Sequence, residues 1–366
     1  MQITDKQRQF TFLAHWVETW NWLLWWSADL HKNPNHIWRW VWLFPIYALV
    51  SIFYFVGRRA YDVVDRYEFN NCLKGETVVL RNFGYHFLKE SWRERIRRRI
   101  LEAVLDAQKR GAKVIGLGAL TKAEWLTAGG AWIVEALGDK LKIPIVHGDT
   151  LTAAAVMHRV VRVMKYKTLP PEVFVTGGTS KIGRALTLAL AQRQISVYVY
   201  TQSAKRFAEI ICEAETLGCS KYVLHATNLQ VGAHCRMWVT GKAEKGVGKK
   251  IIATLPHKAV VVNFSVPDPL SVRLLRRRPD VEHLDGGLMG FDPAISSMFF
   301  MMRLKPGMLY SCHAGTMVHA YRGWTHHEVG PVSLTELDVC WEAAMELGLF
   351  LPPYTSHLLP VDVRAD

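Results

Sequence analysis

The sequence predicts an α/β fold with a Rossmann-like parallel sheet, a flanking α/β substrate region and an N-terminal apolar helical segment. Three observations lead to this prediction. A glycine-rich turn follows a short apolar run at residues 173–183. Further apolar runs of strand length recur with helix-length segments between them, which is typical of a parallel sheet covered on both faces. Two long apolar stretches lie before residue 60.

Composition limits the classes of function. The chain has 366 residues, half of them apolar, and a formal net charge of +13, so it can form two or three domains with a large core. A basic surface attracts nucleic acid, anionic membranes or phosphate-bearing carriers. No aromatic–basic repeat or zinc-finger spacing supports nucleic acid. The six cysteines contain no C-x-x-C pair, so we expect a reducing compartment and neither a disulfide framework nor a metal site.

The first apolar stretch covers residues 10–26 and contains one formal charge, Glu18. The second covers residues 40–56 without a charge, and as a helix it reaches roughly 25 Å, slightly less than a ~30 Å hydrocarbon core. Arg58 and Arg59 follow it, which favours a cytosolic far side. We therefore expect one membrane span after an interfacial or second spanning helix. A buried helical hairpin of a soluble domain is the alternative.

The segment between the apolar stretches and residue 170 has mixed α/β character. An amphipathic helix with a very basic face begins near Ser91. That face is either solvated or rests against anionic lipid or an acidic carrier. Apolar strands are predicted at 113–120 and 143–147, and a helix at 151–164, before a Pro-Pro boundary.

A strand–turn–helix–strand unit begins after that boundary. The predicted elements are a strand at 173–175, a turn at 176–180, a helix at 181–193 and a strand at 195–200, with further strands at 221–224, 236–240 and 259–263. Gly177 and Gly178 permit a tight turn and close approach of a phosphate, and Gly183 lets the helix pack against the strand. A turn that binds nothing is the alternative interpretation. No Tyr-x-x-x-Lys follows the glycine turn, so the nucleotide unit lacks the proton-donor pair of short-chain dehydrogenases.

The second strand indicates which dinucleotide the turn binds. No acidic residue follows it to bind a ribose 2′-hydroxyl, whereas hydroxyls and two basic side chains do follow. This pattern suits a 2′-phosphate and therefore predicts NADP(H) rather than NAD(H). The predicted cofactor-binding residues are Thr176, Gly177, Gly178, Thr179, Ser180, Lys181, Ile182, Gly183, Thr201, Ser203, Lys205 and Arg206.

The candidate catalytic residues are Cys312, His313 and His319. We predict a helix that begins near Cys312, where the helix dipole and adjacent His313 favour a thiolate. Either histidine could supply a proton. The alternative is that Cys312 is a small buried apolar residue. His326 and His327 are adjacent and therefore rarely point the same way, so no metal is expected there.

Three segments carry a resemblance to a known family. They are Lys109-Arg-Gly-Ala-Lys-Val114, His147-Gly-Asp-Thr-Leu-Thr-Ala-Ala-Ala155 and His319-Ala-Tyr-Arg-Gly-Trp-Thr-His-His-Glu-Val-Gly330. Residues from about 60 to 352 resemble the C-terminal domain of the plant eceriferum wax proteins, in the branch proposed to form aldehydes. More distantly they are similar to the cyanobacterial long-chain acyl-[acyl-carrier-protein] reductase. In that family a cysteine twelve residues before the Trp of a Gly-Trp pair accepts the acyl group, and Cys312 stands at that spacing from Trp324.

The resemblance implies NADPH-dependent reduction of a long-chain or very-long-chain acyl thioester to an aldehyde, through an acyl-cysteine on Cys312. The substrate would be carried by coenzyme A or a carrier protein, and an apolar tunnel near 298–302 would hold its chain. Full-length wax proteins also have a histidine-rich di-iron domain, whereas this chain offers only His31 and His36 as a paired spacing. The alternatives are a non-catalytic acyl- or NADP(H)-binding partner of a di-iron aldehyde-to-alkane enzyme, a fragment of such an enzyme, or another membrane-associated Rossmann enzyme.

We expect four regions in all. They are membrane-associated helices at 1–60, an α/β substrate-side domain at 61–170, a Rossmann-like NADP(H)-binding domain at 171–285 and a C-terminal helical region with the candidate nucleophile at 286–366. The expected partners are membrane lipid and a di-iron enzyme. The resemblance implies a location at the endoplasmic reticulum membrane with the catalytic part in the cytosol.

Overall fold

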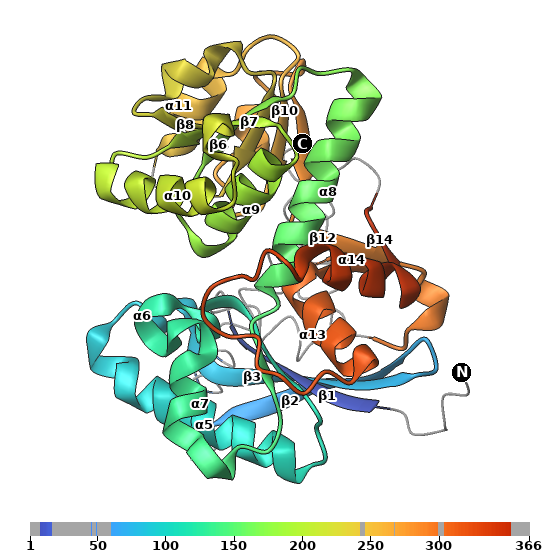
Figure 1. Cartoon of the computed structure of the whole chain (residues 1–366). Coiled ribbons are helices and arrows are strands. Elements are labelled where there is room, and N and C mark those ends of the chain that lie inside the picture. The colour runs from blue at the N-terminus through green and yellow to red at the C-terminus, as the bar shows by residue number, and fades with distance from the viewer. Residues whose placement is uncertain are drawn as a thin grey trace. The chain divides into compact units, whose positions relative to one another are not determined.

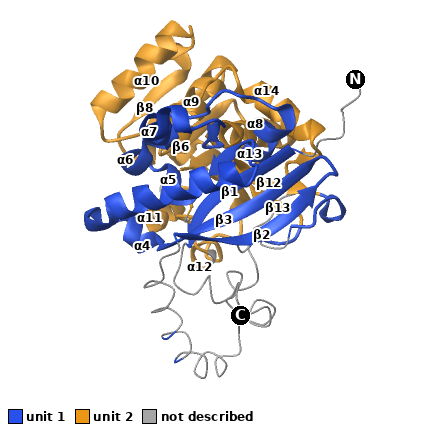
Figure 2. Cartoon of the chain, turned by 90° about the horizontal axis from the view of Figure 1, so that it is seen from below, with its two compact units in different colours: residues 1–148, 292–306, 315–330 blue, residues 149–291, 307–314, 331–366 orange. Residues whose placement is uncertain are grey.

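The computed structural model describes residues 8–16, 45, 49, 60–241, 246–266, 268–298 and 304–352. Internal contacts divide the chain into two units, and neither is a single continuous segment (Figure 2). Unit 1 contains residues 1–148, 292–306 and 315–330, and unit 2 contains residues 149–291, 307–314 and 331–366. The helix around 151–164 was assigned from sequence to the substrate-side domain, but it lies in unit 2 and packs on the helix that follows the glycine turn.

Unit 1 is built on a five-stranded sheet in the order β2-β3-β1-β4-β5. Strands β3, β1, β4 and β5 run parallel to one another, and β2 is antiparallel to β3. The strands are β1 (Arg8–Trp16), β2 (Tyr61–Phe69), β3 (Leu73–Phe83), β4 (Ile115–Leu117) and β5 (Ile145–Val146); the helices are α4 (Gly84–Phe87), α5 (Arg93–Lys109), α6 (Glu124–Thr127) and α7 (Ala131–Leu137). This sheet with its helices forms an α/β layer (Figure 1).

The first strand corrects the prediction for the N-terminus. Residues 10–16 were expected to be helical, but they form the central strand of this sheet, with Phe10, Phe12 and Trp16 fully buried. An uninterrupted apolar run fits a buried strand as well as a helix, so periodicity alone does not separate the two. The remaining residues of the two apolar stretches, apart from positions 45 and 49, lie outside the described part of the chain. Among the described residues, no helix has both the length and the apolar character needed to cross a bilayer.

Helix α5 confirms the amphipathic helix expected after Ser91. Ile96, Ile100 and Val104 are buried and pack in the core of unit 1. One of the arginines expected on the basic face points inward instead. Arg99 is buried and donates hydrogen bonds to the Arg81 carbonyl and to Asn82 Oδ1.

Unit 2 contains a six-stranded sheet in the order β11-β10-β9-β6-β7-β8, with every neighbouring pair parallel. The strands are β6 (Glu172–Thr176), β7 (Ser196–Tyr200), β8 (Val223–Ala226), β9 (Met237–Thr240), β10 (Val260–Asn263) and β11 (Glu282–Asp285). The helices are α8 (Asp149–Lys167), α9 (Lys181–Gln192), α10 (Ala204–Thr216), α11 (Val247–Thr254) and α12 (Val272–Leu275). The chain moves outward from β6 to β8, returns beside β6 as β9, and moves outward again to β11. This is the strand order of a Rossmann fold.

Side chains on both faces of this sheet explain the helices that cover it. Phe174, Trp238 and Val261 lie on neighbouring strands and pack with Ile251 of α11 in one buried cluster. Helix α9 packs against β6 and β7, and α10 packs against β8 (Figure 1). The predicted parallel sheet is therefore confirmed, and its neighbouring strands β6, β9 and β10 are buried as their apolar sequences require.

A smaller antiparallel sheet completes the fold of unit 2. It has the order β13-β12-β14. Its strands are β12 (Leu288–Phe291), β13 (Met308–Tyr310) and β14 (Leu349–Phe350), and α14 (Leu337–Glu346) precedes the last of them. Helix α13 (Ser311–Arg322) follows β13 directly. Residues 299–303, in which part of the acyl tunnel was expected, lie outside the described residues.

Candidate functional site

The candidate site lies at the carboxyl edge of the six-stranded sheet. The strand order reverses between β6 and β9, so the connections that leave these two strands run in opposite directions. Ligands of open parallel sheets bind in the crevice that such a reversal creates. Thr176 and Gly177 stand at the end of β6, and Thr240 and Gly241 stand at the end of β9.

The turn after β6 has the backbone conformation that its glycines permit. Gly177 has a φ of +74°, in the region that side chains with a Cβ rarely adopt. Ser180 caps α9, because its Oγ accepts a hydrogen bond from the Gly183 amide and donates one to the Gly177 carbonyl. A Cβ on residue 183 would lie 2.1 Å from the Gly177 oxygen and 2.8 Å from Gly178 Cα. Only glycine at 183 lets the helix start this close to the turn.

These residues fit the phosphates of a dinucleotide. The first turn of a helix presents backbone N–H groups without intrahelical acceptors, and its dipole favours an anion. The first turn of α9 contains no acidic residue. Thr176 Oγ1 is buried and has no hydrogen-bond partner among the described residues. A buried hydroxyl without a partner is unfavourable, so a ligand that bonded to it would relieve that cost.

One predicted cofactor residue has a partner of its own. Lys181 Nζ lies 2.8 Å from Asp149 Oδ2, and Asp149 is buried at the first position of α8. The ion pair connects the first residue of α9 to the first residue of the preceding helix. Lys181 therefore has a structural role that the sequence did not indicate. Thr179 and Ile182 are partly exposed next to it.

The turn after β7 places two basic side chains in solvent. Thr201 Oγ1 accepts a hydrogen bond from the Ser203 amide, and Ser203 Oγ accepts one from the Arg206 amide. Ser203 thereby caps α10. Lys205 and Arg206 are exposed in the first turn of α10, which contains no acidic residue. This arrangement leaves both cations accessible to a 2′-phosphate.

The three candidate catalytic residues lie on one helix in different environments. Cys312 is half-buried at the second position of α13, and His313 and His319 are buried. Burial lowers the pKa of His313 to about 3 and that of His319 to about 4. An imidazole that is neutral at pH 7 supplies no positive charge to favour the Cys312 thiolate. His319 Nε2 also lies 3.0 Å from the His326 carbonyl oxygen.

The His-His-Glu-Val-Gly run has a structural role in unit 1. Glu328 continues the sheet beyond β5, because its backbone N–H donates to the Ile145 carbonyl and its carbonyl accepts from the His147 amide. Its carboxylate lies 2.9 Å from His147 Nδ1. His327 Nδ1 accepts from the Ile145 amide. Two of the three segments that carry the family resemblance therefore meet here, through His147 and Glu328, although these residues are far apart along the chain.

Sequence reasoning missed a group of ionisable residues near the ends of β10 and β11. Asp285 is the last residue of β11, and burial raises its pKa to about 6. His283 Nε2 lies 2.8 Å from Asp268 Oδ2, and this partner outweighs the burial that opposes it, so the pKa of His283 is raised. The only sequence signal was the Asp-Gly-Gly run at 285–287. It gives no indication of the partner at 268.

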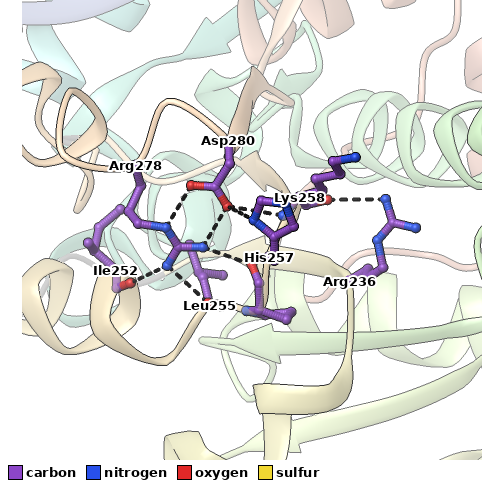
Figure 3. Close-up of polar contacts among 8 residues, drawn as sticks. Arg236, Ile252, Leu255, His257, Lys258, Arg278 and Asp280 are labelled. Carbon is purple, nitrogen blue, oxygen red and sulfur yellow. Dashed lines mark hydrogen bonds and ion pairs between the residues drawn. The ribbon is translucent and has the colours of Figure 1, made fainter.

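A second cluster, also missed, lies at the amino edge of the same sheet (Figure 3). Arg278 donates to both carboxylate oxygens of Asp280 at 2.8 Å. It also donates to the carbonyls of Ile252, Leu255 and Pro256, at the end of α11. This hydrogen bonding holds the pKa of Asp280 below its usual range. The guanidinium therefore caps α11 and ties it to the start of β11.

Comparison with known proteins matches residues from both units. Residues 173–352 match the family model described as the CER1-like, C-terminal domain. The chain is 31% identical over 361 residues to the very-long-chain aldehyde decarbonylase GL1-1 of Oryza sativa subsp. indica, covering 94% of this chain and 54% of the relative. It is 25% identical over 317 residues to the very-long-chain aldehyde decarbonylase CER1 of Arabidopsis thaliana, covering 86% and 47%. The chain thus spans about half the length of these relatives.

Solved structures give a more distant likeness. Quinate dehydrogenase from Corynebacterium glutamicum in complex with NAD matches 93% of this chain and all of its own, with 13% identity and a TM-score of 0.42. Shikimate 5-dehydrogenase from Thermus thermophilus matches 93% of this chain with 13% identity and a TM-score of 0.39.

The names of the relatives correct the predicted reaction. An acyl-thioester reductase forms an aldehyde, whereas the relatives are named for decarbonylation of very-long-chain aldehydes. The prediction of an NADPH-dependent acyl reductase with an acyl-cysteine on Cys312, and with it the aldehyde-forming branch, is therefore wrong. The spacing of Cys312 from Trp324 matches a pattern of a more distant family and does not indicate the reaction of these relatives.

Proposed function

Through residues 173–352 the chain belongs to the family of CER1-like C-terminal domains, and on that premise we propose that it is the NADP(H)-binding part of a very-long-chain aldehyde decarbonylase system. It acts together with a di-iron domain or partner that converts the aldehyde to an alkane. The relatives' names support the substrate class. Their length, about twice that of this chain, supports a division of labour with a further domain. Association with the endoplasmic reticulum membrane is part of this proposal.

The observation that supports the nucleotide assignment most strongly is the close approach of Gly183 to the backbone of the turn after β6. It brings the start of α9 to the point where the strand order reverses. The backbone N–H groups of that turn would hold the pyrophosphate, and Thr176 Oγ1 would bond to the ligand. Lys205 and Arg206 would pair with the 2′-phosphate. NADPH, when bound, supplies a hydride, that is, two electrons at a time.

The binding test uses the purified full chain and titration calorimetry with NADPH. Gly183→Ala should weaken NADPH binding at least about tenfold, because the added Cβ must displace the Gly177 carbonyl. Gly287→Ala is the matched control, since a Cβ there would meet only Phe264 Cα at 3.9 Å. Thermal melts should show that both variants remain folded. Equal affinity of the wild type and Gly183→Ala would contradict the assigned turn.

A separate variant tests whether the site prefers NADPH or NADH. Arg206→Glu should weaken NADPH binding about tenfold and leave NADH binding unchanged, because only NADPH carries a 2′-phosphate. Lys249→Glu changes the same charge at an exposed position on α11 and should change neither affinity. Tighter binding of NADH than of NADPH by the wild type would exclude the phosphate assignment.

The pathway assignment is tested separately. Membranes that contain a very-long-chain aldehyde decarbonylase would be given labelled aldehyde and NADPH, with and without this chain. The wild type should raise the alkane yield, and Gly183→Ala should not. If the wild type binds NADPH but leaves the yield unchanged, the decarbonylase role fails while the nucleotide site stands.

A further inference from the structure

Three residues with metal-binding side chains meet at the amino edge of the six-stranded sheet. Glu172 is the first residue of β6. His234 ends the short helix η6 (Leu229–His234), and Cys235 follows it, two residues before β9. Because β6 and β9 are parallel neighbours, with Phe174 opposite Trp238, their amino ends lie side by side. The sheet thus joins a carboxylate to an imidazole and a thiol from a segment about sixty residues further on.

The distances suit a single ion. Cys235 Sγ lies 3.4 Å from His234 Nε2, and His234 Nε2 lies 3.7 Å from Glu172 Oε2. The three ligand atoms are all within 4.8 Å of one another. Tetrahedral zinc has bonds of about 2.3 Å to sulfur and about 2.0–2.2 Å to nitrogen and oxygen. Such bonds place neighbouring ligand atoms roughly 3.3–3.6 Å apart. The thiol and the imidazole already stand at that separation.

The surroundings fix the thiol and leave an approach from solvent. Cys235 is fully buried, whereas the His234 side chain is 51% exposed and that of Glu172 is 25% exposed. Trp238 Nε1–H donates to the carbonyls of Cys235 and Gly232, which fixes the backbone of this turn. An ion can therefore reach the thiol from the side of the imidazole.

We propose that Glu172, His234 and Cys235 bind one Zn²⁺, with water as the fourth ligand. The combination of sulfur, nitrogen and oxygen donors matches zinc and is a poor match for Mg²⁺ or Ca²⁺, which prefer oxygen ligands. The ion links η6 and the start of β9 to the start of β6, at the edge of the sheet opposite the proposed nucleotide site. The site is independent of the proposed function. It also revises the sequence expectation of no metal, which considered only spacing along the chain.

Cobalt provides a direct probe of this site. The full chain, freed of metal with a chelator, would be titrated with Co²⁺ alone, followed by absorption of the thiolate-to-cobalt charge transfer. Wild type should bind one equivalent with this band, and Zn²⁺ should abolish it by displacing Co²⁺. Cys235→Ser should lose the band. Cys212→Ser is the matched control, because Cys212 is an exposed thiol on α10, and it should retain the band in full.

A second variant keeps the test decisive if Cys235→Ser does not fold. His234 is half exposed, so His234→Ala should fold, and it should bind Co²⁺ at least about tenfold more weakly than wild type. Zn²⁺ should raise the unfolding temperature of wild type and not that of His234→Ala. The proposal is overturned if wild type shows no thiolate band, if Cys235→Ser retains it, or if His234→Ala binds with unchanged affinity.

Discussion

The two edges of the six-stranded sheet differ in how far their polar groups are satisfied by the protein itself. At the amino edge, Arg278 and Asp280 satisfy each other, and Arg278 also satisfies the last carbonyls of α11 (Figure 3). At the carboxyl edge, Thr176 has a buried hydroxyl without a partner among the described residues, and Asp285 has a carboxyl group with a raised pKa. The Arg278–Asp280 cluster at the amino edge thus serves stability, whereas the carboxyl edge has a buried hydroxyl with no partner among the described residues.

This difference follows from the parallel sheet. Every β–α connection leaves from the carboxyl edge, so helix N-termini and glycine turns collect there. The amino edge receives the ends of helices, and their carbonyls need donors such as Arg278. Variants that separate stability from binding test whether this division is real.

The largest expected effect is on stability, at the amino edge. Arg278→Ala removes the donor of several hydrogen bonds to the end of α11, and it should lower the unfolding temperature by about 8 °C. NADPH affinity should stay unchanged, because the nucleotide would bind at the opposite edge. The neighbouring Arg277→Ala, at an exposed position, is the control and should have little effect. A large loss of NADPH affinity in folded Arg278→Ala would show that the two edges are not separable.

An intermediate effect on stability is expected at Asp285, where a substitution should stabilise the protein. Burial raises the pKa of this carboxyl from 3.8 to about 6, so the ionised form is unfavourable in the folded protein. The stability it contributes is fully present below pH 3.8 and is lost as the pH rises through 6. Asp285→Asn should therefore raise the free energy of unfolding by about 2 kcal/mol at pH 7.5.

Denaturant titrations at several pH values check this prediction. The gain in Asp285→Asn should shrink below pH 6 and vanish near pH 4. Asp268→Asn provides the contrast, because it removes the partner that raises the pKa of His283 from 6.5, and it should destabilise the protein below pH 6.5, where that stability is fully present. A gain for Asp285→Asn that is the same at every pH would refute the electrostatic explanation.

The smallest effect is expected at Thr176. Thr176→Val removes a buried hydroxyl that has no partner among the described residues, so stability should rise by up to about 1 kcal/mol. NADPH affinity should fall roughly three- to tenfold, since one hydrogen bond to the ligand is lost. Thr187→Val on α9 also removes a buried hydroxyl that has no partner among the described residues. It should leave NADPH affinity unchanged. Calorimetry on both variants compares the two positions directly.

Local sequence patterns predicted the nucleotide unit well. The apolar run, the glycines and the helix after them identified β6 and α9 almost to the residue, because each feature has a local cause. The same reasoning predicted that a helix lies near Cys312. It failed for β1, whose partners β3 and β4 lie roughly sixty to one hundred residues away, because pairing over that distance leaves no local pattern.

The sequence did not predict the side-chain partners either. The pairing of Lys181 with Asp149 and of His147 with Glu328 depends on which elements pack together. The low pKa values of His313 and His319 depend on burial. The reaction was mispredicted for a related reason: a cysteine at a familiar spacing says nothing of the environment that would make it reactive.

The position of β1 has a practical consequence for work with shortened versions of the chain. Because β1 lies between β3 and β4, a fragment that begins after residue 16 would lack the middle of its sheet. Both neighbouring strands would then expose unpaired N–H and C=O groups, and such edges promote aggregation. The fragment would also lack Arg8, which donates to the carbonyls at the end of α13. Fragments designed to remove the apolar N-terminal stretches should therefore retain residues 8–16.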